Sequence, residues 1–429
     1  MKYERLDNNI FVSHRKSLVD LLEEGDLALF FSNDEMPKSG DQNFPFHQQA
    51  DLFYLTGIDQ AETILALCPT HSNPALREVL FIAESNAQQA VWQGNKLSKM
   101  QAESISGITT IYYLSQKNAV LQEMITESKT LCFNIEEHAR YTTKVITSNC
   151  RQANELMVQY PLHQRKRLAS MMEMLRLRKS AQEIELIQKA CDITADTFME
   201  ILPKIQSGIG EYEIEGAIIG GFLARKATGC SFAPIVAAGA NACILHYTEN
   251  SNICQSGDLL LIDMGAEYAH YAGDLSRTIP INGRFSPRQK QVYQACEDVF
   301  RYARTLYVPG MTINKMQNLV LAFMQSQLQK LGLITAKEIE QETIKYSTVK
   351  RYYMHGLAHF VGLDVHDVGT KDEILDYGMV LSCEPGIYIP EENIGIRIET
   401  VMLVNDTPID LMPNLPLTVE EIELLMNKK

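Results

Sequence analysis

The sequence has no excess of positive charge and no long apolar segment. Its 429 residues contain 39 Lys and Arg against 53 Asp and Glu, a formal net charge of −14. Nucleic acids and anionic membranes attract positively charged surfaces, so we expect neither as a partner. The longest apolar run, AIIGGFLA at 217–224, is far too short for a transmembrane helix.

A secretory signal and a cysteine framework are also missing. The first segment, MKYERLDNNIFVSHRK, is charged and has no apolar central region, which a secretory signal requires. Nine cysteines, an odd number, are scattered without a CxxC pair. This pattern is typical of reduced thiols in the cytosol, and we therefore expect a cytoplasmic protein.

Three common catalytic motifs are absent as well. The sequence contains no GxSxG elbow, no GxxxxGKS or GxxxxGKT phosphate loop, and no GxGxxG after a strand. These absences argue against a nucleophilic serine and against a nucleotide-dependent reaction.

The length predicts more than one domain, because 429 residues exceed what one hydrophobic core usually organises. In the first part, short β-type runs alternate with helical patterns at 96–105 and 118–128. This alternation predicts an α/β domain, which we assign to residues 1–170. The expected strands are Asp26–Ser32, Thr63–Pro69, Glu78–Glu84, Thr109–Ser115 and Thr130–Ile135.

The second domain is assigned to residues 171–429. A basic, Met-rich stretch, His163–Ser180, lies at the boundary and is interpreted as helical. The next helix begins with a capping box, in which Ser180 is followed three residues later by Glu183.

A coarse internal repeat is visible in this second part. Two helical segments precede a pair of acid-bearing strands, and the same order then occurs again. The order indicates a duplicated half-domain, although so coarse a pattern also arises by chance. The expected helices are 180–203, 211–226, 286–307 and 312–331.

Four acidic residues lie in or beside apolar, strand-like stretches. They are Asp263 after LLLI, Asp274 after a Gly- and Tyr-rich turn, Glu384 after MVLSC, and Glu399 inside IGIRIETVMLV. Burying several like charges together is costly unless positive charge compensates them. Arg397 is a nearby basic residue, and one or two divalent cations would compensate more completely. Alternatively, the four acids face different surfaces and never meet.

Three histidines fall within MHGLAHFVGLDVHD, at His355, His359 and His366, and His246 precedes Asp263. The stretch is not the HExxH zinc motif, because glycine follows the first histidine. Carboxylates with one imidazole form an oxygen-rich ligand set, which suits Mn, Co, Fe(II) or Zn better than Cu(I). Four acids exceed the needs of one catalytic metal, so the set favours a two-metal site.

The motifs LLLIDMGAEYAHYAGDLSRT, HGLAHFVGLDVHD, EPGIYIP and GIRIE resemble the metal-binding motifs of the pita-bread metallopeptidases. The resemblance is greatest to the Xaa-Pro aminopeptidases, with the prolidases next. FHQQADLFYLTGIDQAETILAL and VWQG resemble the amino-terminal domain of that family. The implied fold is an α/β, creatinase-like domain at 1–170 followed by an α+β pita-bread catalytic domain at 171–429.

The resemblance implies a dinuclear metal site. Asp274 and Glu399 would contact both ions, Asp263 would contact one, and His359 and Glu384 would contact the other. The implied ions are manganese, with cobalt or zinc as alternatives. The implied substrates are peptides with proline at the second position, from which a hydroxide bridging the metals releases the first residue.

Catalytic and substrate-binding roles follow from the same resemblance. Glu384 would transfer the proton, while His246 and His366 would stabilise the oxyanion and position the peptide. His355 and Tyr388 would line the proline pocket.

Two assignments lie further from the chemistry. Arg397 would help to hold the acid cluster together. Trp92 would reach toward an active site, and the alternative for Trp92 is ordinary core packing. The resemblance also implies a homodimer or homotetramer.

Two other functions stay open. A prolidase would cleave only dipeptides, although FYLTG and VWQG favour the aminopeptidase. A non-catalytic peptide- or protein-binding pita-bread protein is the other alternative. The presence of all five metal ligands argues against it.

Overall fold

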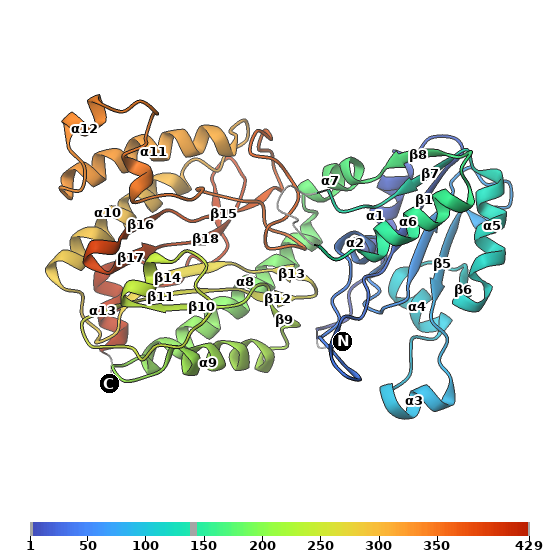
Figure 1. Ribbon diagram of the computed structural model, residues 1–429, viewed down its shortest axis with the longest axis horizontal. Coiled ribbons are helices and arrows are strands. Elements are labelled where there is room, and N and C mark those ends of the chain that lie inside the picture. Colours follow the sequence, from blue (N-terminus) through green and yellow to red (C-terminus); the bar gives the residue numbers. More distant parts are fainter. Residues whose placement is uncertain (1–2, 138–143, 428–429) are drawn as a thin grey trace. The chain divides into compact units, whose positions relative to one another are not determined.

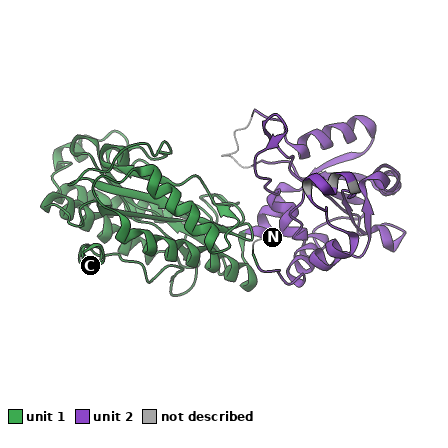
Figure 2. Cartoon of the chain, turned by 90° about the horizontal axis from the view of Figure 1, so that it is seen from below, with its two compact units in different colours: residues 1–3, 177–429 green, residues 4–176 purple. Residues whose placement is uncertain are grey.

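The computed structural model describes residues 3–137 and 144–427, and Figure 1 labels their helices and strands. The chain forms two compact units, coloured separately in Figure 2. One unit is Glu4–Arg176, and the other begins at Leu177 and includes Tyr3. The units divide inside helix α7 (Ala169–Leu177), a few residues after the expected boundary.

A six-stranded mixed sheet organises the unit Glu4–Arg176. Its order is β6-β5-β4-β1-β7-β8, with β1 antiparallel to β4 and parallel to β7. All five predicted strands are present. The six strands are β1 (Asp26–Phe31), β4 (Ile64–Leu67), β5 (Glu78–Ile82), β6 (Ile111–Tyr113), β7 (Thr130–Phe133) and β8 (Gln164–Arg167), and a separate ribbon pairs β2 (Pro37–Ser39) with β3 (Gln42–Asn43).

Helices cover both faces of this sheet. Leu27, Leu29 and Phe31 of β1 join one core cluster with residues of α5 and α6, and α2 packs on β1 as well. A strand covered on both faces is apolar without alternation, as β1 is. The helices are α1 (Asn9–Val19), α2 (Ala50–Thr56), α3 (Ala87–Gln93), α4 (Lys99–Ser106), α5 (Lys117–Glu127) and α6 (Ser148–Gln159).

The helical interpretation of the basic stretch is wrong over its first part, which forms strand β8. Lys166 Nζ donates to Asp26 Oδ2 at 2.8 Å and lies 3.0 Å from Glu23 Oε1. Charged side chains suit an edge strand because they discourage pairing with other chains. The helical pattern is realised only in α7, which follows.

The second unit contains four small sheets, and its strands lie between α8 and α9 on one side and α10 and α11 on the other (Figure 1). The sheet orders are β10-β11-β14, β13-β12-β9, β15-β18-β19 and β16-β17. The strands are β9 (Gly229–Cys230), β10 (Ile235–Ala238), β11 (Leu259–Met264), β12 (Ala266–Tyr268), β13 (Tyr271–Ala272), β14 (Leu275–Pro280), β15 (Val380–Cys383), β16 (Gly386–Ile389), β17 (Ile394–Arg397), β18 (Thr400–Leu403) and β19 (Ile409–Asp410).

The four predicted helices of this unit are confirmed. Ser180 accepts from the backbone N–H of Glu183, and the Glu183 side chain accepts from the Ser180 N–H, so the predicted capping box is present. The helices are α8 (Ala181–Ile201), α9 (Glu211–Ala224), α10 (Pro287–Arg304), α11 (Ile313–Lys330), α12 (Ala336–Glu340) and α13 (Val419–Met426). No helix in the described ranges is both long and apolar enough to cross a membrane.

The strands of the two halves meet beside β14. The N–H of Glu399 donates to the carbonyl of Ser276 at 3.0 Å, and the N–H of Arg397 donates to Thr278 Oγ1 at 3.2 Å. The α/β unit is thus followed by an α+β unit in which separate chain segments, near 270 and near 395, lie side by side. This arrangement is the one expected from the sequence.

A buried ion pair provides a test of the second unit's stability. Lys179 Nζ lies 2.8 Å from Asp367 Oδ2, and both side chains are only 1% exposed. We expect Lys179→Met to lower the free energy of unfolding by about 3–5 kcal/mol, because the Asp367 carboxylate loses its buried cation. Urea unfolding at neutral pH measures this loss.

Lys204→Met is the matched control. It removes the exposed pair between Lys204 and Glu200, whose atoms are 2.9 Å apart. That change should cost less than about 1 kcal/mol. Equal losses in the two variants would contradict the prediction.

Candidate functional site

The four predicted acids lie at strand ends in the second unit. Asp263 is the penultimate residue of β11, and Asp274 directly precedes the antiparallel strand β14. Glu384 directly follows β15, and Glu399 separates β17 from β18. Each apolar strand therefore ends at, or close to, an acidic side chain.

His359 brings part of this set together. Ligand atoms of Asp274, His359 and Glu399 lie within 4.8 Å of one another. His359 Nε2 is 3.3 Å from Asp274 Oδ2 and 3.7 Å from Glu384 Oε1. The Nδ1 atom of His359 is 3.0 Å from the carbonyl oxygen of Phe360, which fixes the ring with Nε2 toward the acids. The alternative in which the acids never meet is therefore wrong.

Arg397 supplies a cation at the edge of the cluster. Its Nη2 donates to Asp263 Oδ2 at 2.6 Å, and its Nε donates to Ser276 Oγ at 2.8 Å. The Ser276 hydroxyl in turn donates to Glu399 Oε2 at 2.7 Å. One arginine and one serine thus connect two of the acids that come from opposite halves of the unit.

The buried acids repel one another, and their pKa values reflect it. Burial raises the pKa of Asp263 to about 6, with Arg397 opposing the shift and Asp274 adding to it. Burial raises the pKa of Glu384 to about 7, although His359 lowers it. Burial also raises the pKa of Glu399 well above its usual value, and Asp274 and Glu384 raise it further. The cluster holds more negative charge than Arg397 neutralises.

His359 responds to the same charges in the opposite sense. Burial lowers its pKa, but the contact with Asp274 and the charge of Glu384 outweigh burial, and the net shift is upward. Without a metal ion the imidazole therefore tends to hold a proton among the acids.

The donor set fits divalent cations. Asp263 Oδ1 is buried and has no hydrogen-bond partner among the described residues. Four carboxylates and an imidazole offer more ligand atoms than one ion uses. The carboxylates lie at strand ends, and the backbone carbonyl of His359 accepts from the N–H of Ser382 in β15. A divalent cation at Asp274, His359 and Glu399 would compensate both the burial and the mutual repulsion of these carboxylates.

A hydrogen-bonded chain extends from Arg397 to His355. Arg397 Nη1 donates to Tyr388 Oη at 3.0 Å, and Tyr388 Oη is 2.9 Å from His355 Nε2. His355 Nδ1 is 2.8 Å from the carbonyl oxygen of Gly356. Because a carbonyl oxygen only accepts hydrogen bonds, Nδ1 carries the proton and donates it. Burial and the charge of Arg397 lower the pKa of His355 to about 3, so its ring is neutral and accepts the Tyr388 O–H.

His246 and His366 are both exposed and lie near this site. The His366 ring centroid is 4.3 Å from that of His359, nearly at right angles to it. The charge of His246 contributes to the lowered pKa of His355. The two histidine rings are therefore close enough to interact electrostatically.

Trp92 lies in α3 of the other unit and is 84% exposed. The alternative of ordinary core packing for Trp92 is therefore wrong.

Sequence reasoning missed two serines that orient the acids. Ser276 bonds Glu399 and Arg397, and Ser382 Oγ accepts from the N–H of His359 at 3.1 Å and lies 3.4 Å from Glu384 Oε1. Each serine is two residues from a predicted acid, so the strand period of two places it near the same face. That spacing was the available signal.

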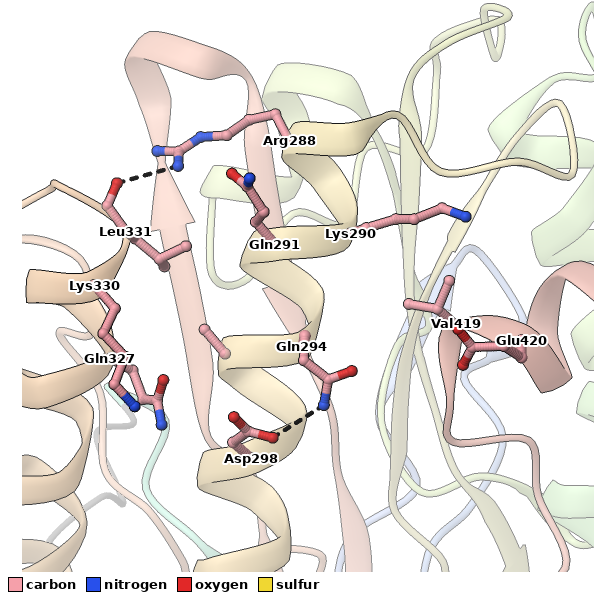
Figure 3. Close-up of a pocket in the computed structure, with 11 residues that line it drawn as sticks. Arg288, Lys290, Gln291, Gln294, Asp298, Gln327, Lys330, Leu331, Val419 and Glu420 are labelled. Atoms are coloured by element: carbon pink, nitrogen blue, oxygen red, sulfur yellow. Dashed lines mark hydrogen bonds between the residues drawn. The ribbon is translucent and has the colours of Figure 1, made fainter.

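A separate surface pocket of about 520 Å³ lies between α10, α11 and α13 (Figure 3). It is polar and is lined in part by Arg288, Lys330 and Asp298, and it contains none of the predicted site residues. The predicted metal ligands lie elsewhere in the unit, around the ends of β11, β14, β15 and β18.

Two family models match the chain. Residues 185–406 match metallopeptidase family M24, and residues 11–133 match the aminopeptidase P, N-terminal domain. The Xaa-Pro aminopeptidase of Escherichia coli is 34% identical over 441 residues, which cover 97% of this chain and 97% of that protein. Xaa-Pro aminopeptidase 3 of Homo sapiens is 27% identical and covers 94% of this chain and 81% of that protein.

Solved structures agree over nearly the whole chain. Zinc-substituted aminopeptidase P of E. coli in complex with product has a TM-score of 0.89 and 31% identity, covering 99% of this chain and 100% of that one. The aminopeptidase PepP of Pseudomonas aeruginosa has a TM-score of 0.89 and 28% identity, covering 98% of each chain.

The raised pKa values predict a pH-dependent effect of divalent cations. When a chelator has removed all metal, these acids stay protonated to higher pH in the folded chain than in the unfolded chain. Between roughly pH 4 and pH 7 the folded chain therefore binds more protons than the unfolded chain. This stabilisation is present at low pH and disappears as Asp263 and Glu384 ionise. Adding manganese should therefore raise the unfolding temperature much more at about pH 7.5 than at about pH 5, because ligands must lose protons to bind it.

Thermal unfolding monitored by circular dichroism measures this difference. His359→Ala is the control, since it should remove most of the manganese-dependent rise. An equal rise at both pH values in the unsubstituted chain would count against the acid cluster as the binding site.

Proposed function

Because the chain belongs to metallopeptidase family M24 and carries the aminopeptidase P N-terminal domain, we propose that it is a metal-dependent Xaa-Pro aminopeptidase. It removes the first residue of peptides whose second residue is proline. The observation that carries the proposal is the convergence of Asp274, His359 and Glu399 beside Asp263 and Glu384. These are the five residues that the family's metal-binding motifs predict.

Asp263, Asp274, His359, Glu384 and Glu399 would hold two divalent ions. When bound, such ions supply a water of lowered pKa as the nucleophile. Arg397 and Ser276 hold Asp263 and Glu399 in position, which leaves the remaining carboxylate oxygens available as ligands. Manganese is the ion that we propose, on the family resemblance.

Proton transfer is assigned to Glu384. Its carboxylate lies 3.7 Å from His359 Nε2, beside the proposed metal ligands, where it could exchange a proton with a metal-bound water. The nitrogen of the scissile bond belongs to the proline ring and carries no hydrogen. A proton delivered by Glu384 would let this nitrogen leave as an amine.

The histidines are assigned to the peptide. Neutral His355 and Tyr388 would form one wall of the proline pocket, since their contacts fix both rings. His366, packed edge-on against His359, and His246 would stabilise the developing oxyanion and orient the substrate. The exposed Trp92 would reach an active site within an assembly, and a homodimer or homotetramer is proposed on the family resemblance.

The carboxylate shuttle is tested by measuring activity and bound metal in the same variants, because Glu384 is also a proposed metal ligand. Glu384→Gln should lower kcat by at least about 100-fold, because the amide cannot accept the proton. His366→Ala should also lower kcat strongly while the bound manganese, measured by elemental analysis, stays at the level of the unsubstituted chain. His359→Ala should lose both activity and metal. Activity of Glu384→Gln comparable with the unsubstituted chain would refute the assignment.

The substrate class can be tested with three short peptides and added manganese. An Xaa-Pro-Xaa tripeptide should be cleaved after its first residue, and the matched Xaa-Ala-Xaa tripeptide should not. Cleavage of the Xaa-Pro dipeptide alone would indicate the prolidase. No cleavage together with no metal uptake would indicate the non-catalytic binding protein.

A further inference from the structure

Helix α9 has an outer surface that is unusual for a surface helix. The sequence's longest apolar run, residues 217–224, lies in it. Ile214, Ile218 and Phe222 face the core, as an amphipathic helix requires. The opposite surface, however, is apolar as well.

The outward residues form a continuous strip along the helix. Tyr212, Ile219 and Leu223 are 55%, 37% and 43% exposed, and Gly216 and Gly220 lie between them and are exposed too. No charged side chain occurs between Glu215 and Arg225. A solvent-facing helix surface is normally polar, so almost three turns without charge indicate a contact surface.

Two of the glycines have no explanation inside the unit. A Cβ added at Gly221 would lie 2.6 Å from Thr197 Cγ2, so packing against α8 requires that glycine. A Cβ added at Gly216 or Gly220 would meet nothing within 4 Å. Glycine destabilises a helix interior relative to alanine. The packing of the unit itself therefore does not require glycine at positions 216 and 220, whereas close approach of a neighbouring molecule would require it.

The strip is complementary to itself. Ile219 and Leu223, four residues apart, form a ridge, and Gly216 and Gly220, also four apart, form a groove beside it. When two such helices cross about a two-fold axis, each ridge fits into the other's groove. Small residues at these positions allow the backbones to approach closely.

The charges at the two ends favour the same arrangement. Glu215 lies near the beginning of α9 and Lys226 lies just after its end, and neither side chain has a hydrogen-bond or ion-pair partner among the described residues. An antiparallel pair places the beginning of one helix beside the end of the other. Each Glu215 would then approach the other copy's Lys226, so a two-fold pair gains two opposite-charge contacts.

We infer that the outer strip of α9 (Tyr212, Gly216, Ile219, Gly220 and Leu223) is a self-association surface, on which a second copy of this chain docks its own α9 antiparallel. Figure 1 shows α9 at the outside of its unit, with its strands on the inner side. The inference does not depend on the proposed catalytic activity. It assigns a surface to the assembly that the family resemblance only suggests.

Two substitutions test the strip without harming the helix. Ile219→Lys breaks the ridge and creates a favourable pair with Glu215 four residues earlier. Gly220→Leu fills the groove and should improve helix stability, since the structure leaves space there. Both variants should self-associate at least about tenfold more weakly than the unsubstituted chain, as is common for changes at the centre of an interface. Sedimentation velocity on the full chain over a concentration series measures this.

The matched control is Leu319→Lys, an equally apolar position on α11 that is 43% exposed. It should leave the association constant unchanged. Circular dichroism and thermal unfolding verify that each variant is folded.

A charge exchange tests the antiparallel geometry. Glu215→Lys alone should weaken association, and the double variant Glu215→Lys with Lys226→Glu should restore it. The inference is overturned if the unsubstituted chain stays monomeric throughout, if Ile219→Lys and Gly220→Leu associate normally, or if Leu319→Lys weakens association equally. Failure of the double variant to recover would overturn the antiparallel arrangement.

Discussion

Repulsion among buried carboxylates is the constraint on which the second unit depends. Asp263, Asp274, Glu384 and Glu399 are brought to neighbouring strand ends, where burial first and the neighbouring acids second raise the pKa values of three of them. Taking several charges out of water together is unfavourable, and the positive charge of Arg397 compensates only part of this cost. The fold therefore holds an arrangement that it would not adopt for stability alone, which is typical of a functional site.

Strand pairing makes this arrangement rigid. β11 and β14 are held antiparallel by six residue pairs, and the backbone N–H of Glu399 donates to the carbonyl of Ser276. The apolar runs before the acids anchor each strand in the core, so the carboxylates cannot separate without breaking the sheet. A metal ion then meets ligands that are already in place, and little ordering accompanies its binding.

The sequence predicted the four long helices of the second unit, five of the six strands in the first unit's sheet and the membership of the acid cluster. Helix caps and apolar periodicity are local signals, and they located the beginning of α8 at its Ser180 cap. The acids were recognised because a charged side chain is unexpected inside an apolar run that predicts a buried strand. Strand β8 was missed because its pattern is polar, and its position at the sheet edge depends on β7, far away in sequence.

Contacts between distant segments could not be read in the same way. The bonds from Arg397 to Asp263, Ser276 and Tyr388 join residues whose spacing carries no periodic signal. Hydropathy also does not show how much of an apolar helix is covered by the rest of the protein. The run in α9 was recognisable only as too short for a membrane, since composition cannot separate a helix buried on all sides from one with an open apolar side. Burial decides between the two: Phe222 lies in the core, whereas Leu223 beside it faces out. An apolar run longer than the core needs is therefore a reason to look for a second contact surface.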